Sequence, residues 1–132
     1  MQILLDFDSE TPIYLQLKHQ IIAGIAKGTL QPKEPLPSVR MMAKDIGINQ
    51  HTVNKTYQML KQEGYIQIHR QKGVVIHPDG VDKADESYYQ SLEASLNPMI
   101  ADAICRQITK DDFQQIITKL YQTYERKGDE TK

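Results

Sequence analysis

The sequence of 132 residues predicts a mainly α-helical fold that contains one small β-hairpin. Apolar residues recur at helical spacing along most of the chain, glycines and prolines interrupt these runs, and a short alternating segment lies near residues 65–76. Hydrophobic residues make up 39% and charged residues 25%, as in ordinary folded domains. We therefore expect one small domain at residues 1–80 and a helical tail at residues 81–132.

The first helix is predicted to start at residue 11. Thr11 is expected to cap it and Pro12 to occupy its first position, where the N–H that proline lacks has no helical partner in any case. Gly28 supplies the left-handed residue that ends the helix. The apolar stripe consists of Ile13, Leu17, Ile21 and Ile25, widened by Tyr14 and Ile22. Residues 30–37 hold three prolines, which favour an extended connector.

Two short helices joined by a tight turn are expected next. Ser38 caps the first and Gly47 ends it, whereas Asn49 caps the second, which ends at Gly64. The inward positions are Val39, Met42, Ala43 and Ile46 in the first helix, and Val53, Thr56, Tyr57 and Leu60 in the second. Two helices around a short turn that contains glycine form the helix-turn-helix pattern.

A two-stranded hairpin is predicted after this pair of helices. Residues 65–68 alternate, residues 70–73 have turn composition, and residues 74–76 are all β-branched. A hairpin in this position is a wing. The run Pro78-Asp79-Gly80 ends it and marks the boundary to the tail.

The tail is predicted to contain two amphipathic helices. Asn97-Pro98 should kink or divide the first, and Thr109 to Asp112 resembles a capping box with aspartate in place of glutamate. Two helices alone cannot bury both apolar stripes, so they pack either on the first domain or on a second copy of the chain. We expect a homodimer. Its predicted interface comprises Tyr88, Leu92, Leu96, Ile100, Ile104, Phe113, Ile116, Ile117, Leu120, Tyr121 and Tyr124.

The charge of the chain is distributed unevenly. The formal net charge is −1, but residues 1–80 carry nine Lys and Arg against seven acids, and residues 81–132 carry seven against ten. The most basic window, residues 38–72, has six cations against two acids. These cations are Arg40, Lys44, Lys55, Lys61, Arg70 and Lys72. A local basic patch of this kind suits contact with phosphates.

The sequence offers little support for catalysis or export. The acidic N-terminus lacks the features of a secretory signal, and a single cysteine, Cys105, fits a reducing cytoplasm and is expected to be buried. The four histidines have no metal-binding spacing, and no glycine-rich phosphate loop is present. The pair Asp111-Asp112 is assigned to the first turn of a helix, where acids favour the dipole. We therefore expect a cytoplasmic protein that is not an enzyme, does not enter a membrane and needs no cofactor or metal.

Several short motifs occur in the order and spacing of one known family. They are Pro12-Ile13-Tyr14, Leu36-Pro37-Ser38-Val39-Arg40, Thr52-Val53 followed by Tyr57 and Leu60, and Glu63-Gly64. Over residues 11–77 the chain thereby resembles the GntR family of winged helix-turn-helix regulators. The short helical tail and residues 48–53 resemble its YtrA-like subgroup, although Gln50 and His51 stand where proline and asparagine are common. Gln71 at the wing tip replaces a usual glycine.

This resemblance implies a transcriptional regulator that binds operator DNA as a homodimer. It suggests a repressor of its own or a neighbouring operon, often one for a membrane transporter. The residues expected to contact DNA are Ser38, Arg40, Lys44, Asn49, Gln50, His51, Thr52, Asn54, Lys55, Arg70 and Lys72. Glutamine and asparagine suit adenine, and the planar fork of Arg40 suits phosphate or guanine.

The sequence alone also allows explanations other than DNA contact for these residues. A solvated polar helix face would explain the residues at 50–55, capping explains Ser38, and a surface salt bridge would explain Arg40. The chain as a whole is alternatively a sensor with a small effector or metal between tail and winged domain. A third reading is a protein-interaction module with a winged fold that does not bind DNA.

Overall fold

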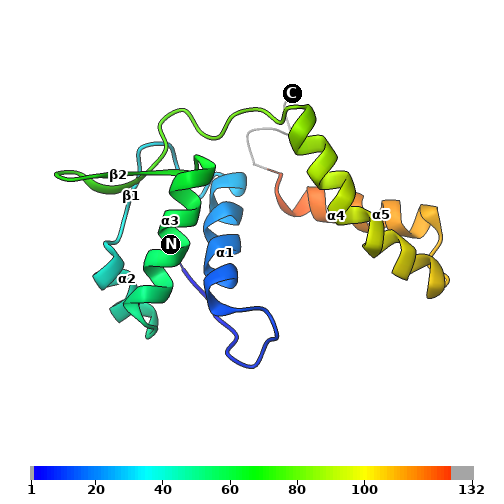
Figure 1. Cartoon of the computed structure of the whole chain (residues 1–132), viewed down its shortest axis with the longest axis horizontal. Helices are drawn as coiled ribbons and strands as arrows, with labels where there is room; N and C mark the ends of the chain where they lie inside the picture. The colour runs from blue at the N-terminus through cyan, green and yellow to red at the C-terminus, as the bar shows by residue number, and fades with distance from the viewer. Residues whose placement is uncertain (1, 126–132) are drawn as a thin grey trace. The chain divides into compact units, whose positions relative to one another are not determined.

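Five helices and three short strands make up the part of the chain that the structure describes, residues 2–125 (Figure 1). The structure is a computed structural model. The chain divides into two compact units, residues 1–81 and 82–132. The first holds α1 (Ile13–Lys27), α2 (Val39–Ile46), α3 (Gln50–Glu63) and all three strands, and the second holds α4 (Glu86–Cys105) and α5 (Lys110–Thr123). The predicted fold class, mainly α-helical with a winged helix-turn-helix and two tail helices, is confirmed.

The helix-turn-helix has the boundaries that its capping residues predict. The Ser38 hydroxyl accepts a hydrogen bond from the Met41 N–H at 3.1 Å, and the Asn49 side chain accepts one from the His51 N–H at 2.7 Å. Gly47 ends α2 with φ +72°, a left-handed conformation that glycine adopts without a steric penalty. These short local contacts determine where α2 and α3 begin and how sharply the chain turns between them.

The start of α1 differs from the prediction. Pro12, not Thr11, occupies the capping position, and no side chain caps the helix. Pro12 has an extended ψ of 147°, and its carbonyl oxygen accepts the first helical hydrogen bonds, from the Leu15 and Gln16 N–H groups. The Thr11 carbonyl oxygen is bound instead by the Gln16 side-chain amide, which holds Thr11 outside the helix.

The sheet has one strand more than predicted. Its order is β1 (Pro35–Leu36), β3 (Gly73–Ile76), β2 (Ile66–His69), with both pairings antiparallel. The predicted hairpin is therefore present, and part of the supposed connector joins it at the free edge of β3. A proline is tolerated in β1 because this strand lies at the edge of the sheet.

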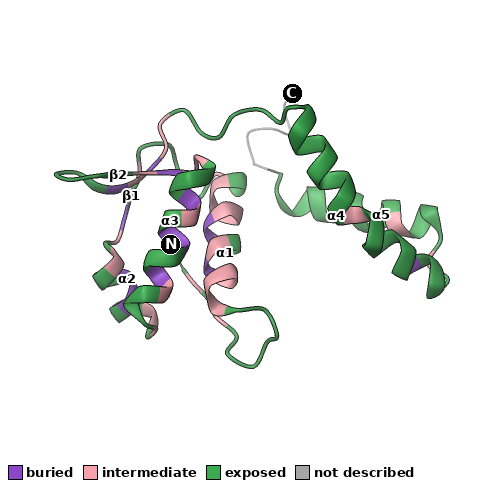
Figure 2. Ribbon diagram, viewed as in Figure 1, coloured by how far each residue is buried: buried purple, intermediate pink, exposed green. Residues whose placement is uncertain are grey.

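The core of the first unit is centred on α3 (Figure 2). Both α1 and α2 pack against this helix, and β2 contacts it as well. The predicted inward residues of α3, namely Val53, Thr56, Tyr57 and Leu60, are all fully buried. Two polar contacts add to this packing between α1 and α3. The Thr56 hydroxyl donates to the Tyr14 carbonyl oxygen at 2.9 Å, and Lys18 forms an ion pair with Glu63 at 2.7 Å.

The tail unit consists of two helices whose apolar side chains are mostly exposed (Figure 2). Asn97-Pro98 is expected to kink this helix or to divide it, and division is not observed, because α4 continues through Pro98. The capping box of α5 is confirmed, because Thr109 and Asp112 each bind the other's backbone N–H. None of the helices within residues 2–125 combines the length and apolar character that crossing a membrane requires.

The expectation that Cys105 is buried is wrong. Its thiol is exposed, whereas Ala103, two residues earlier on α4, is buried. Two residues along an α-helix correspond to a rotation of roughly 200°. Cys105 therefore lies on the side of α4 away from the buried alanine.

Candidate nucleic-acid interface

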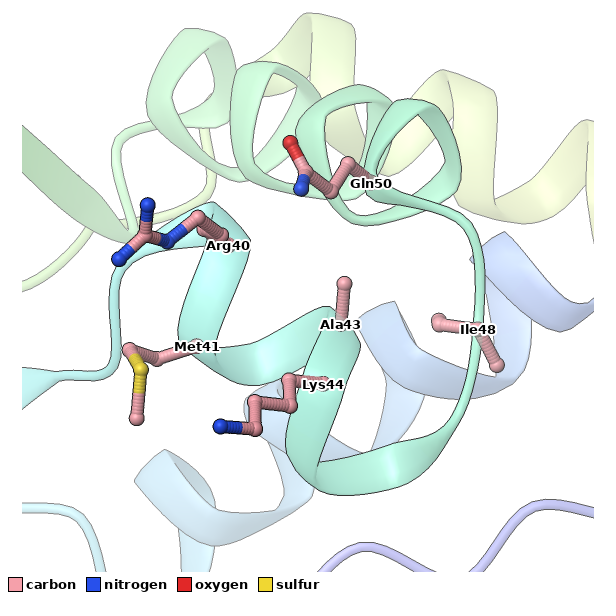
Figure 3. A pocket seen from close by; sticks show the side chains of 6 residues that line it. All are labelled: Arg40, Met41, Ala43, Lys44, Ile48 and Gln50. Carbon is pink, nitrogen blue, oxygen red and sulfur yellow. The ribbon is translucent and has the colours of Figure 1, made fainter.

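Polar and basic side chains from α2 and α3 meet at an open hollow of about 410 Å³ on the surface of the first unit (Figure 3). Arg40 and Lys44 reach it from α2, and Gln50 reaches it from the first position of α3. Its apolar lining consists of Met41, Ala43 and Ile48. The helix-turn-helix thus brings together two cations and an amide that are up to ten residues apart in the sequence.

A second open hollow adjoins the first, because Gln50 lines both. It has a volume of about 660 Å³, and its other lining residues are Val39, Asn49, His51 and Asn54. The amides of Gln50 and Asn54 therefore lie beside α2, on one flank of α3. Four of the predicted contact residues on or next to α3 line these hollows, namely Asn49, Gln50, His51 and Asn54, and Arg40 and Lys44 line the first hollow as well. Thr52, another predicted contact residue, is half-buried and lines neither hollow.

The side chains around the two hollows differ in how far they are already engaged. The oxygens of Ser38 and Asn49 accept the capping hydrogen bonds of α2 and α3. Arg40, Lys44 and His51 are exposed, and none forms an ion pair with another residue of the segment 2–125. Their hydrogen-bond donors are thus available to a ligand at this face.

The opposite flank of α3 contains a contact that the sequence reasoning missed. The Lys55 ammonium lies over the aromatic ring of Tyr14, with 3.8 Å between Nζ and the ring centroid. A cation held over the face of an aromatic ring is attracted by the negative charge of that face. The sequence assigns Tyr14 to the apolar stripe of α1 and to the motif Pro12-Ile13-Tyr14, and neither assignment predicts a contact with a lysine. No local pattern indicates the pair, because 41 positions separate Tyr14 from Lys55 in the sequence.

The electrostatics of α3 favour an anionic ligand. Glu63 is the only acid within α3, and its carboxylate is paired with the Lys18 ammonium at 2.7 Å. The outward face of α3 therefore presents His51 and Lys55 without an unpaired carboxylate among them. A face of this composition repels phosphates less than the overall charge of the chain suggests.

The basic residues of the wing lie apart from these hollows. Arg70 and Lys72 are exposed in the turn between β2 and β3, which is where the sequence places them. Gln67 of β2 links the two ends of this hairpin, because its Oε1 lies 3.0 Å from His69 Nε2 near the turn and its Nε2 lies 3.4 Å from His77 Nε2 after β3. Arg70 and Lys72 thus extend the basic surface of the unit at the tip of the hairpin.

Comparisons with known proteins agree on one family. Residues 13–76 match the model described as bacterial regulatory proteins, gntR family. The HTH-type transcriptional repressor YtrA of Bacillus subtilis is 36% identical over 101 residues, which cover 76% of this chain and 78% of that protein.

Solved structures give the same result. YtrA from Sulfolobus acidocaldarius, a GntR-family transcription factor, is 36% identical with a TM-score of 0.55, covering 92% of this chain and 97% of that one. A transcriptional antiterminator from Listeria monocytogenes EGD-e is 25% identical with a TM-score of 0.87, and the match covers 94% of this chain and 92% of that chain. The likeness therefore includes the tail helices as well as the first unit.

Proposed function

The chain belongs to the GntR family of bacterial regulatory proteins and is a DNA-binding transcriptional regulator, and on this premise we propose that it acts as a dimeric repressor. The observation that carries the proposal is the gathering of Arg40, Lys44, Gln50, His51 and Asn54 around two adjoining hollows at the start of α3. In a helix-turn-helix, the N-terminal residues of the second helix reach base edges in the major groove. The residues around the hollows are therefore those that would meet DNA first.

The chemistry of these side chains suggests which DNA group each one contacts. The amides of Gln50 and Asn54 match adenine, which offers an acceptor and a donor together at N7 and N6. Arg40 suits guanine or a phosphate, and the N-termini of α2 and α3 direct backbone N–H groups toward phosphates. Arg70 and Lys72 at the wing tip supply further contacts to the phosphate backbone.

The tail supports association into a homodimer. Tyr88, Leu92, Ile104, Leu120 and Tyr121 are all exposed in the single chain. Exposed apolar surface of this kind on two consecutive helices is typical of a protein interface, and a second copy of the same tail would supply an equal apolar stripe to cover it. A two-fold dimer presents two copies of α3, so the operator is expected to be an inverted repeat.

The regulated genes are proposed from the family resemblance. A repressor of this kind binds near the promoter of its own operon or of a neighbouring one, and such operons often encode a membrane transporter. The Bacillus subtilis relative is itself named a repressor. Occupation of an operator that overlaps the promoter excludes RNA polymerase, which is the simplest route from binding to repression.

Footprinting of the purified chain on the DNA upstream of its own gene tests the proposal. We expect two protected half-sites related by two-fold symmetry, and a binding constant whose logarithm falls with the logarithm of salt concentration by about 0.9 for each phosphate neutralised. A protein that protects no DNA at low salt, or binds with no salt dependence, would favour the protein-interaction module instead.

A further inference from the structure

Tyr14 is fixed to α3 through both its backbone and its ring. Its carbonyl oxygen accepts a hydrogen bond from the Thr56 hydroxyl at 2.9 Å, and Thr56 is fully buried. Its ring lies under the Lys55 ammonium at 3.8 Å. Two successive residues of α3 thus contact one residue near the start of α1. The hydrogen bond therefore anchors the Tyr14 backbone beside α3, at the place where its ring meets the Lys55 ammonium.

The two flanks of α3 carry different side chains. On the flank beside α2, Gln50 and Asn54 line the second hollow together with Val39. On the flank beside α1, Lys55 contacts Tyr14. A helix that lies in the major groove, about 12 Å wide, has a phosphate backbone on either side. With α3 in such a groove, Arg40 and Lys55 would face opposite backbones, because Arg40 lies on the α2 side of α3 and Lys55 on the α1 side.

We propose that Tyr14 is a positioning residue that holds the Lys55 ammonium in place to bind a backbone phosphate of the operator. The inference rests on the proposed function. It gives a role in DNA binding to Tyr14, which is not among the predicted DNA-contact residues. A free lysine side chain loses rotamer entropy when it binds a phosphate, and a side chain already held over a ring loses less. The ring face occupies one side of the ammonium, so N–H donors remain for a phosphate oxygen.

The surroundings of Lys55 support this role. Lys55 is exposed, and it forms no ion pair with any carboxylate of the described residues 2–125. Glu63, the single acid of α3, is paired with Lys18 near the other end of the helix. The contact with Tyr14 therefore fixes the position of Lys55 without neutralising its charge.

A double-mutant cycle on the full chain tests the proposal, with operator affinity measured at several salt concentrations. Lys55→Gln should weaken binding and reduce the salt slope by about 0.9, the value for one phosphate. Tyr14→Leu should weaken binding about 3- to 10-fold without changing the slope, because the charge remains while its preorganisation is lost. Tyr14→Phe keeps the ring face and should retain the affinity. The double variant should bind no more weakly than Lys55→Gln alone.

Several outcomes would overturn the proposal. They are an unchanged salt slope in Lys55→Gln, additive losses in the double variant, or equal losses in Tyr14→Phe and Tyr14→Leu. Thermal unfolding of each variant identifies loss of folding. If Tyr14→Leu does not fold, the wild-type NMR spectrum tests whether Lys55 is held over the ring. The Lys55 side-chain protons should then show a ring-current shift, and its absence would contradict the contact between Tyr14 and Lys55.

Arg40→Ala separates this inference from the proposed function. If the wild type fails to bind DNA, the proposed function is wrong. If the wild type binds and Arg40→Ala weakens binding while Lys55→Gln has no effect, only the role of Tyr14 and Lys55 is wrong.

Discussion

The Tyr57 hydroxyl donates a hydrogen bond to the Pro37 carbonyl oxygen at 2.8 Å. Tyr57 is fully buried in the middle of α3, and Pro37 directly precedes Ser38, the cap of α2. The bond therefore fixes the entry of the chain into α2 relative to α3. Since Arg40 lies in the first turn of α2, this core contact also helps to place the guanidinium beside Gln50 at the first hollow.

The first prediction is that the buried Tyr57 makes the folded protein less stable at alkaline pH, and that Tyr57→Phe removes this effect. Burial raises the pKa of Tyr57 above the ordinary value of 10.0. A group whose pKa is higher in the folded state contributes stability that is fully present below pH 10 and is lost as the pH rises beyond it. The wild type should lose up to about 1.4 kcal/mol per pH unit above pH 10 from this residue.

Urea unfolding between pH 7 and 10.5 measures this effect. Tyr57→Phe should be about 1 kcal/mol less stable at pH 7, because the Pro37 carbonyl oxygen loses its donor. It should also lose less stability above pH 10 than the wild type does. Equal losses in the two proteins would show that another group titrates on unfolding.

Much of the helix-turn-helix is predictable because its signals are local. Ser38 and Asn49 bond to N–H groups two or three residues away, and Gly47 needs only its own left-handed conformation. Strand β1 is different. Its two residues include a proline and show no period, and they become a strand only because β3, almost forty residues later, offers a free edge. A sequence pattern cannot indicate a partner so far away.

The same distinction applies to the candidate site. The residues around the hollows follow each other within a single motif, so the family pattern and helical spacing identify them. The contact of Tyr14 with Lys55 and the pairing of Lys18 with Glu63 join α1 to α3 across more than forty positions. Both contacts depend on how α1 packs against α3. No sequence pattern around these residues predicts which partner each one contacts.

The second prediction is that Arg40→Ala weakens operator binding about 10- to 100-fold, the range for one charge-assisted hydrogen-bonded contact. Arg40 is exposed, so the unfolding midpoint should change little. Lys119→Ala, which removes the same charge from an exposed position of α5, is the matched control and should bind as the wild type does. Fluorescence anisotropy with labelled operator measures both. Equal affinities of the two variants would remove Arg40 from the interface.

The third prediction concerns sequence preference. Gln50 lines both hollows, and its amide matches adenine. The wild type should prefer adenine at one position of each half-site by about 1–3 kcal/mol, and Gln50→Ala should abolish that preference while the other positions stay as selective as before. Competition among operators with single substitutions measures this. Gln62→Ala, near the end of α3, serves as the control, and a preference that survives in Gln50→Ala assigns the adenine contact to another side chain.

The last prediction is that Leu120→Glu separates the dimer. Leu120 is 52% exposed in the single chain and belongs to the predicted apolar stripe of α5. Burial of a carboxylate without a partner costs several kcal/mol, and it would occur in both copies of a two-fold interface. Gln122→Glu adds the same charge two residues further on, roughly 200° around the helix, and should stay dimeric.

Sedimentation gives the mass of each variant, and anisotropy gives its operator affinity. Since a dimer makes the second contact with DNA intramolecular, the monomeric variant should bind a full operator at least 100-fold more weakly, about the lower limit of such linkage. If Leu120→Glu stays dimeric, Leu120 is not part of the interface, and the tail stripe of α5 needs another explanation.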